Sequence, residues 1–117
     1  MSEPIHMPRL VGGGWETAPF VPFREGVEIA RLHDGPPAVA LLRYAPGAGV
    51  PAHFHRGLET ILVLEGSQSD ERGEYAEGSL ILNPEGTSHR VWSDNGCVVL
   101  IQWTLPVEFL PADPEGK

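Results

Sequence analysis

Glycine and proline interrupt this sequence so often that a long helix has no room to form. Fourteen glycines and twelve prolines are spread over 117 residues, and both residue types destabilise the interior of a helix. The segments between them are short and rich in valine, isoleucine, leucine and aromatic residues, which favour strands. These segments are 26–33, 38–45, 58–66, 79–83, 88–92 and 97–105. Many short strands separated by turns predict an all-β sandwich or barrel with little or no helix.

One of the turns can be predicted in more detail. Residues 93–96 read SDNG, and an Asn-Gly pair tolerates the positive φ angles of a type I′ turn. Turns of this type join neighbouring antiparallel strands. We therefore expect the strands on either side of this turn to form a hairpin.

The sequence predicts one domain, residues 26–110, between two less regular ends. A chain of this length fits a single domain. Residues 1–25 mix prolines and glycines with scattered apolar side chains of no clear period, so we expect a partly flexible arm. Residues 111–117 are polar and are expected to fray. Three aromatic side chains of the arm could pack on the barrel or on a partner subunit: Trp15, Phe20 and Phe23.

Composition and charge exclude several classes of function. Eight basic against sixteen acidic residues give a formal net charge of −8, which disfavours binding to nucleic acid or to a membrane surface. No run of apolar residues is long enough to span a membrane. The first residues lack the pattern of a signal peptide, so we expect a cytoplasmic protein. The single cysteine, Cys97, excludes an intrachain disulfide and is expected to pack as a small hydrophobic side chain.

Three histidines and one glutamate have spacings that could bring them together. His53 and His55 are two residues apart, so they share one face of a strand. Their imidazoles, about 7 Å apart along a strand, can converge on one atom only where the backbone bends. Glu59 can turn back toward them across Gly57, and His89 follows a turn thirty residues further on. Three imidazoles and one carboxylate suit a divalent transition metal.

Each of these residues also has a simpler interpretation when it is considered alone. A single histidine beside apolar residues usually lies at the surface or is satisfied in the core, and a single glutamate is usually solvated. The occurrence of four such residues together, flanked by glycines at defined distances, favours a metal site. The two other histidines, His6 and His33, are expected at the surface.

The same residues carry a resemblance to the cupin superfamily. Residues 47–66 match its first motif, G-x5-H-x-H-x3-E-x6-G, at each fixed position, and residues 78–93 match the second, G-x5-P-x-G-x2-H-x3-N, except at the last. Ser93 stands at that last position, which is not a metal ligand in the family. The matched positions are Gly47, His53, His55, Glu59, Gly66, Gly78, Pro84, Gly86 and His89. The resemblance covers residues 26–106.

The resemblance implies a double-stranded β-helix, or jelly roll, with a metal inside the mouth of the barrel. Within the superfamily, the sequence looks most like the small cupins of the ChrR type. These are similar to the C-terminal domain of a zinc-dependent anti-sigma factor and to dioxygenases that cleave acetylacetone. Cupins often pair, so the resemblance also implies a homodimer.

Three functions are compatible with such a site. The first is a small Fe(II) dioxygenase that acts on a chelating, dicarbonyl-like small molecule. The second is a non-catalytic zinc-bearing sensor or ligand-binding module similar to the anti-sigma-factor cupin, although the sequence contains no helical sigma-binding domain. The third is an isomerase or lyase of the same fold without redox chemistry. The donor set favours Fe²⁺ or Zn²⁺ without selecting one of them. Imidazole and carboxylate also accept Mn²⁺, Ni²⁺ or Cu²⁺.

Four further residues are candidates for the wall of the ligand pocket. Gln102 is an isolated polar residue in the apolar segment VVLIQW, and a buried amide would need partners. It could instead face solvent on the outside of the barrel. Trp92, Arg43 and Tyr44 lie on expected strands, and Trp92 could equally be part of the hydrophobic core.

Overall fold

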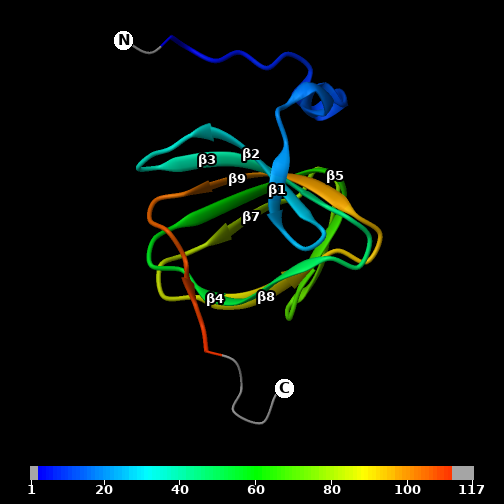
Figure 1. Cartoon of the computed structure of the whole chain (residues 1–117). Coiled ribbons are helices and arrows are strands. Elements are labelled where there is room, and N and C mark those ends of the chain that lie inside the picture. Colours follow the sequence, from blue (N-terminus) through cyan, green and yellow to red (C-terminus); the bar gives the residue numbers. More distant parts are fainter. Residues whose placement is uncertain (1–2, 112–117) are drawn as a thin grey trace.

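The computed structural model describes residues 3–111, which fold into ten strands and two short 3₁₀ turns (Figure 1). The strands are β1 (Val21–Arg24), β2 (Val27–His33), β3 (Ala38–Tyr44), β4 (Gly49–Phe54), β5 (Glu59–Asp70), β6 (Gly73–Ala76), β7 (Leu80–Asn83), β8 (Ser88–Trp92), β9 (Cys97–Trp103) and β10 (Glu108–Phe109). The turns are η1 (Leu10–Gly12) and η2 (Gly14–Thr17). In the described range no helix is long and apolar enough to cross a membrane. The prediction of an all-β chain is confirmed. Residues 112–117 of the predicted tail lie outside the described residues.

The strands form two facing sheets that share one long strand. The larger sheet has the order β1-β2-β3-β9-β5-β7, and the smaller one the order β10-β4-β8-β5-β6, with antiparallel pairing throughout. The twelve residues of β5 pair with β9 and β7 in their first half and with β6 and β8 in their second. Because β5 belongs to both sheets, the structure curls into the half-barrel of a jelly roll (Figure 1).

The turn at residues 93–96 does not make the hairpin that its sequence predicts. The strand before it, β8, pairs with β4 and β5, whereas the strand after it, β9, pairs with β3 and β5. Gly96 has a φ of 90°, but Asn95 is not among the residues with positive φ, so no type I′ turn forms. The segment instead carries the chain from one sheet to the other.

The inner faces of the two sheets enclose the main hydrophobic core. Side chains from β2, β3, β4, β5, β8 and β9 meet there, and most are aliphatic. Cys97 lies in this core, as the sequence predicts for a small hydrophobic side chain, and burial raises the pKa of its thiol to about 11. The core residues are Val27, Ile29, Ala40, Leu42, Tyr44, Val50, Ile61, Val63, Val91, Cys97, Val99 and Ile101.

A second, smaller core covers the outer face of the larger sheet. Its centre is Trp15 in η2, which is buried against outward-facing residues of the strands, including Leu41 and Val98. Phe20 packs at the edge of this cluster. Phe23, on β1, instead lines the cavity inside the barrel. Residues 7–24 therefore pack on the barrel of their own chain, with the 3₁₀ turns over the larger sheet (Figure 1).

Candidate metal centre

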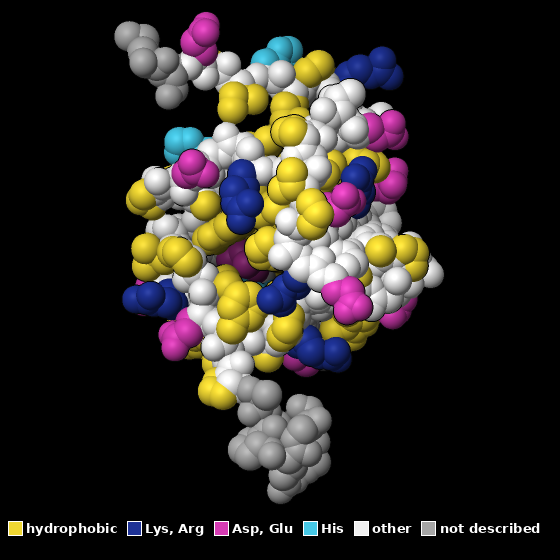
Figure 2. Space-filling model, in the orientation of Figure 1, with side chains coloured by type: hydrophobic (Ala, Val, Ile, Leu, Met, Phe, Trp, Pro, Cys, Tyr) yellow, Lys and Arg dark blue, Asp and Glu magenta, His cyan; other side chains and the backbone are white. Residues whose placement is uncertain are grey.

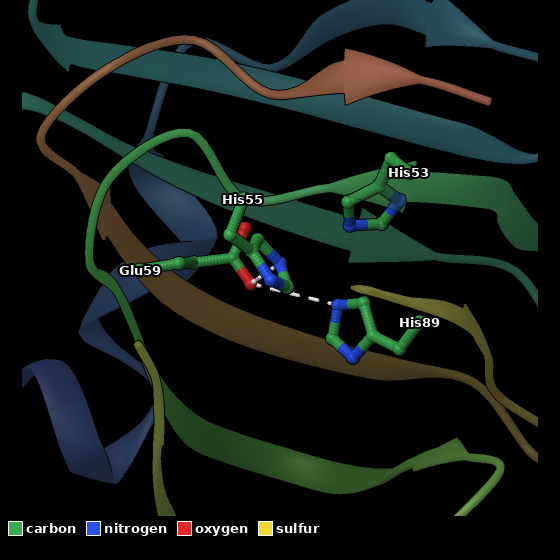
Figure 3. Close-up of side chains that lie close together, drawn as sticks. All are labelled: His53, His55, Glu59 and His89. Atoms are coloured by element: carbon green, nitrogen blue, oxygen red, sulfur yellow. Dashed lines mark ion pairs between the residues drawn. The ribbon is translucent and has the colours of Figure 1, made fainter. Parts of the chain in front are cut away.

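Four side chains from two parts of the chain, residues 53–59 and His89, converge inside the barrel (Figure 3). His53 lies on β4, His55 directly follows this strand, Glu59 begins β5, and His89 lies on β8. One ligand atom from each of them lies within 4.8 Å of the others. All four residues are at most 4% exposed. The structure thus brings together the four residues that the sequence predicts as metal ligands.

The backbone bends where the histidines require it. His53 lies opposite His89 in the ladder of β4 and β8, and the register of this ladder shifts between Val50 and His53. After β4 the chain leaves the regular strand, and His55 is held by backbone hydrogen bonds from its N–H to the Thr87 carbonyl (2.8 Å) and from the Gly86 N–H to its own carbonyl (2.9 Å). His53 and His55 therefore converge, although a straight strand would keep their side chains apart.

Hydrogen bonds at Nδ1 determine the tautomer of each histidine. The Nδ1–H of His53 donates to the carbonyl of Pro51 (2.8 Å), and that of His89 donates to the carboxylate of Asp70 (3.1 Å). His55 Nδ1 lies 2.9 Å from the hydroxyl of Thr87. This hydroxyl donates its own proton to the Pro84 carbonyl (2.6 Å), so it accepts from His55. Since each Nδ1 carries a proton, each neutral ring keeps an unprotonated Nε2.

The unprotonated nitrogens face a carboxylate. Oε1 of Glu59 lies 3.1 Å from Nε2 of His55 and 3.6 Å from Nε2 of His89 (Figure 3). Burial opposes ionisation of Glu59, but a proton on His55 or His89 would lie against its carboxylate, and this interaction outweighs burial and lowers its pKa to about 2. Asn83 donates a further hydrogen bond to Oε1 (3.1 Å). Glu59 is therefore an ionised, oriented acceptor.

This set of atoms fits a bound cation. The Nε2 atoms of His55 and His89 are buried and have no hydrogen-bond partner. Lone pairs of imidazole and a carboxylate would repel one another at these distances, unless a proton or a metal ion lies between them. Three nitrogen donors and one oxygen donor are typical of sites for Fe²⁺, Zn²⁺ and similar ions. The buried cluster can therefore hold one metal ion, and its four donors leave coordination positions of a five- or six-coordinate ion free.

The histidines differ in their affinity for protons. Burial lowers the pKa of His53, which keeps this ring in the neutral, metal-binding form. Burial also acts to lower the pKa of His89, but the carboxylates of Glu59 and Asp70 outweigh it and raise this pKa. A metal ion at the centre would replace the proton that these carboxylates favour on His89.

A small, mostly apolar cavity adjoins the four residues. Its volume is about 70 Å³, enough for roughly five water molecules. Aliphatic side chains of the inner core form most of its wall, and Phe23, Val107 and Phe109 complete it. Figure 2 shows a hollow with an acidic side chain at its floor, bordered by hydrophobic and basic side chains. A ligand in this cavity would lie beside the metal, largely shielded from water.

Of the four pocket candidates from the sequence, Tyr44 lines this cavity. Gln102 is exposed, because Ile101 and Trp103 on either side of it point inward and strand alternation turns it outward. Trp92 is half-buried outside the cavity wall, where its ring packs 4.4 Å from the Arg90 guanidinium.

Arg43 also lies outside the cavity wall. It alternates with Leu42 and Tyr44, which point inward, so it faces the outside of the larger sheet. There its guanidinium pairs with Glu28 (2.8 Å) and lies 4.2 Å from the centre of the Phe20 ring. The arginine therefore packs against the N-terminal segment instead of a ligand.

Four functional candidates have no signal in the sequence motifs. Asp70, Thr87 and Asn83 hold His89, His55 and Glu59 by the hydrogen bonds described above. Asp70 also accepts hydrogen bonds from the Tyr75 hydroxyl (2.9 Å) and the Arg72 N–H (2.8 Å). Burial opposes ionisation of Asp70, but the hydrogen bonds from His89, Arg72 and Tyr75 outweigh it and lower its pKa. Gln68 is 2% exposed and lines the cavity. A polar residue in the buried part of a strand is the one general clue to such positions.

Solved structures with similar folds include a regulator and an enzyme. One is the complex of Rhodobacter sphaeroides SigE with the anti-sigma ChrR, at 30% identity and a TM-score of 0.72, covering 80% of this chain and 54% of that one. Another is an acetylacetone dioxygenase from Acinetobacter johnsonii, at 18% identity and a TM-score of 0.77, covering 100% of this chain and 82% of that one. At such low identity, the likeness to the dioxygenase shows the fold alone.

The sequence itself identifies the family. Residues 12–106 match the family described as the ChrR cupin-like domain. The chain is also 32% identical over 109 residues to the anti-sigma-E factor ChrR of Cereibacter sphaeroides. This match covers 91% of the chain but only 51% of the relative, so the chain spans about half the length of that protein. The chain therefore belongs to the family of ChrR cupin-like domains.

Proposed function

We propose that this protein binds a divalent transition metal through His53, His55, Glu59 and His89 and uses it to act on a small chelating molecule. The observation that carries the proposal is the buried donor set, with two Nε2 atoms that lack a partner, beside an apolar cavity. A purely structural metal site is closed by its ligands, whereas a cavity next to the donors gives a second molecule access.

The cavity favours a compact, largely apolar ligand with two oxygen donors. Its volume of about 70 Å³ excludes large substrates, and its aliphatic wall disfavours a highly charged one. A β-dicarbonyl meets both conditions, because its two oxygens can chelate one ion while its methyl groups contact the aliphatic wall. We propose molecules of this class as substrates of a dioxygenase that uses Fe²⁺.

The residues of the chain would act by orienting and shielding. Asp70 and Thr87 hold two imidazole rings so that Nε2 faces the centre, and Asn83 holds the carboxylate of Glu59. Val107 and Phe109, on the segment that crosses to β4, form part of the cavity wall and exclude water. When bound, Fe²⁺ supplies the chemistry that joins a chelated substrate to dioxygen, and Zn²⁺ or Ni²⁺ would supply Lewis-acid chemistry of an isomerase or lyase.

A second candidate is a zinc-bearing regulatory module that binds a ligand without turnover. It is supported by the 32% identity to the anti-sigma factor ChrR, which exceeds the identity to the dioxygenase. In this case the cavity would bind an effector, and the outer surface would contact a partner protein. The predicted homodimer and the cytoplasmic location stay predictions in both cases.

Oxygen uptake distinguishes the two candidates. The protein loaded with Fe²⁺ is assayed with a panel of β-diketones and keto acids, and His89→Ala serves as the control. Uptake that depends on both a β-diketone and His89 supports the dioxygenase. If uptake does not exceed that of the control, the dioxygenase is rejected. Protein purified with zinc alone, together with a stable partner recovered in a pull-down, would then support the regulatory module.

A further inference from the structure

Two buried polar side chains in the cavity have no part in holding the metal ligands. Tyr44 enters from β3 in the larger sheet, and Gln68 enters from the second half of β5. They are 4% and 2% exposed, respectively. Three of the candidate ligands, His53, Glu59 and His89, also line the cavity, and the remaining side chains of its wall are hydrophobic. Polar groups in such a place need partners.

The pair uses only part of its hydrogen-bonding capacity. Nε2 of Gln68 donates to the Tyr44 hydroxyl over 3.4 Å, a long bond. Within residues 3–111, neither side chain forms a second hydrogen bond with another side chain. The hydroxyl proton of Tyr44, the second N–H of Gln68 and its carbonyl oxygen are therefore free for a ligand. Burial, with smaller effects from Cys97 and Glu59, raises the pKa of Tyr44, so the phenol stays protonated and can donate.

The position of the pair places it within reach of a ligand on the metal. Gln68 lies two residues before Asp70 on the same face of β5, about 7 Å along the strand. Asp70 in turn accepts a hydrogen bond from His89 (3.1 Å). His53, Glu59 and His89 line the same cavity as the pair, so a ligand in this cavity can contact the metal centre and the pair at once.

We propose that Tyr44 and Gln68 determine ligand specificity by donating hydrogen bonds to an oxygen of the ligand that is not bound to the metal. This inference rests on the proposed function, because it requires a small chelating ligand in the cavity. It restricts the substrate class to chelating molecules that carry one further uncharged acceptor, such as an ether or carbonyl oxygen. The polar pair would then contact the additional oxygen of the ligand, and the apolar wall would contact its hydrocarbon part.

Two probes of equal shape test the proposal. The first is 1-methoxy-2,4-pentanedione, and the second is 2,4-heptanedione, which has a methylene group in place of the ether oxygen. Their dissociation constants are measured by calorimetry on the full chain loaded with Zn²⁺, which avoids turnover. For the wild-type protein we expect the methoxy probe to bind roughly three- to tenfold more tightly, the range for one hydrogen bond between neutral groups.

In the variants Tyr44→Phe and Gln68→Leu, the methoxy probe should bind no more tightly than 2,4-heptanedione. Gln102→Leu is the matched control, since it makes the same change outside the cavity, and it should keep the preference. Thermal unfolding and zinc content show whether each variant is folded and loaded. If one of the two variants fails to fold, the two probes are compared on the wild-type protein and on the other variant, and this comparison decides.

Two results would overturn the proposal, and they differ in meaning. If both probes bind the wild-type protein equally, or if folded Tyr44→Phe and Gln68→Leu keep the preference, the specificity role is wrong and the proposed function stands. If neither probe binds the zinc-loaded wild-type protein, while the metal is bound, the cavity does not accept chelating diketones. In that case both proposals fail.

Discussion

The two faces of the larger sheet show how the same strands can build a solid core on one side and a hollow site on the other. On the outer face, Trp15 fills the space over the strands, and the cluster around it is entirely hydrophobic. On the inner face, the core is also hydrophobic, but it surrounds a cavity with Tyr44, Gln68 and three of the four candidate ligands in its wall.

The Trp15 cluster and the candidate metal site therefore lie on opposite sides of the larger sheet. The N-terminal segment closes the outer face and touches none of the four candidate ligands through a described hydrogen bond or ion pair. The ligands are held from the inside, by Pro51, Asp70, Thr87 and Asn83. Changes on one face should therefore leave the other largely intact.

The largest effect is expected from removal of one ligand. His89→Ala takes away one of four donors, and the affinity for Zn²⁺ or Fe²⁺ should fall by more than the roughly 100-fold that loss of an outer hydrogen bond can cause. Metal content after dialysis, measured by mass spectrometry, should drop far below one ion per chain. His33→Ala, a change at an exposed histidine on β2, is the matched control. Full metal retention in His89→Ala would contradict the site.

A change on the outer face should reduce the stability of the protein without reducing its metal content. Trp15→Ala leaves a cavity under the N-terminal segment, and the free energy of unfolding should fall by about 3 kcal/mol. Urea unfolding measures this loss. The metal content of the folded variant should stay at one ion per chain. The separation of the two faces would be refuted if Trp15→Ala released the metal while the protein remained folded.

Loss of the charge behind His89 should have an intermediate effect on the inner face. Asp70→Asn keeps the shape of the side chain but removes the carboxylate that accepts from Nδ1 of His89, so we expect metal affinity to fall roughly 10- to 100-fold. Competition with a chelator measures the change. Tyr75→Phe is the control, because it removes another hydrogen bond to Asp70 and leaves the charge. Unchanged affinity in Asp70→Asn would mean that packing alone orients the ring.

The smallest effect is expected at Thr87. Thr87→Val preserves the shape but removes the hydroxyl that links His55 to the Pro84 carbonyl. The bond joins neutral groups, so the expected loss of metal affinity is roughly tenfold or less. The same chelator competition detects it. A larger loss than in Asp70→Asn would show that Thr87 positions the loop itself, and the hydrogen bond to the ring would then be secondary.

The sequence motifs located the cluster but not the residues that support it. The spacing of His53, His55, Glu59 and His89 was sufficient, because each lies at a strand end or a turn marked by glycine or proline. Asp70 and Gln68 could not be placed by alternation from Glu59. The register of β5 shifts between Val63 and Glu65, and this irregularity turns the residues after it to the other face.

Gln102 shows the same limit for a strand that is covered on both sides. The segment VVLIQW has apolar residues on both faces, because the core lies under one and the N-terminal segment reaches over the other. Such a strand has no polar alternation from which to read its orientation.

The pairing of the strands could not be predicted from local sequence either. The SDNG sequence predicts a hairpin, but long-range packing of the two sheets determines the partners of β8 and β9.

The central claim is that one metal ion binds to three imidazoles and one carboxylate inside this barrel. X-ray absorption on the zinc-loaded protein, combined with metal analysis, tests it most directly. We expect one ion per chain, nitrogen and oxygen neighbours at about 2.0–2.2 Å with no sulfur, and a higher unfolding temperature with metal than without it. A protein that binds no ion, and whose stability is indifferent to added Fe²⁺, Zn²⁺, Mn²⁺, Ni²⁺ or Cu²⁺, would contradict the claim.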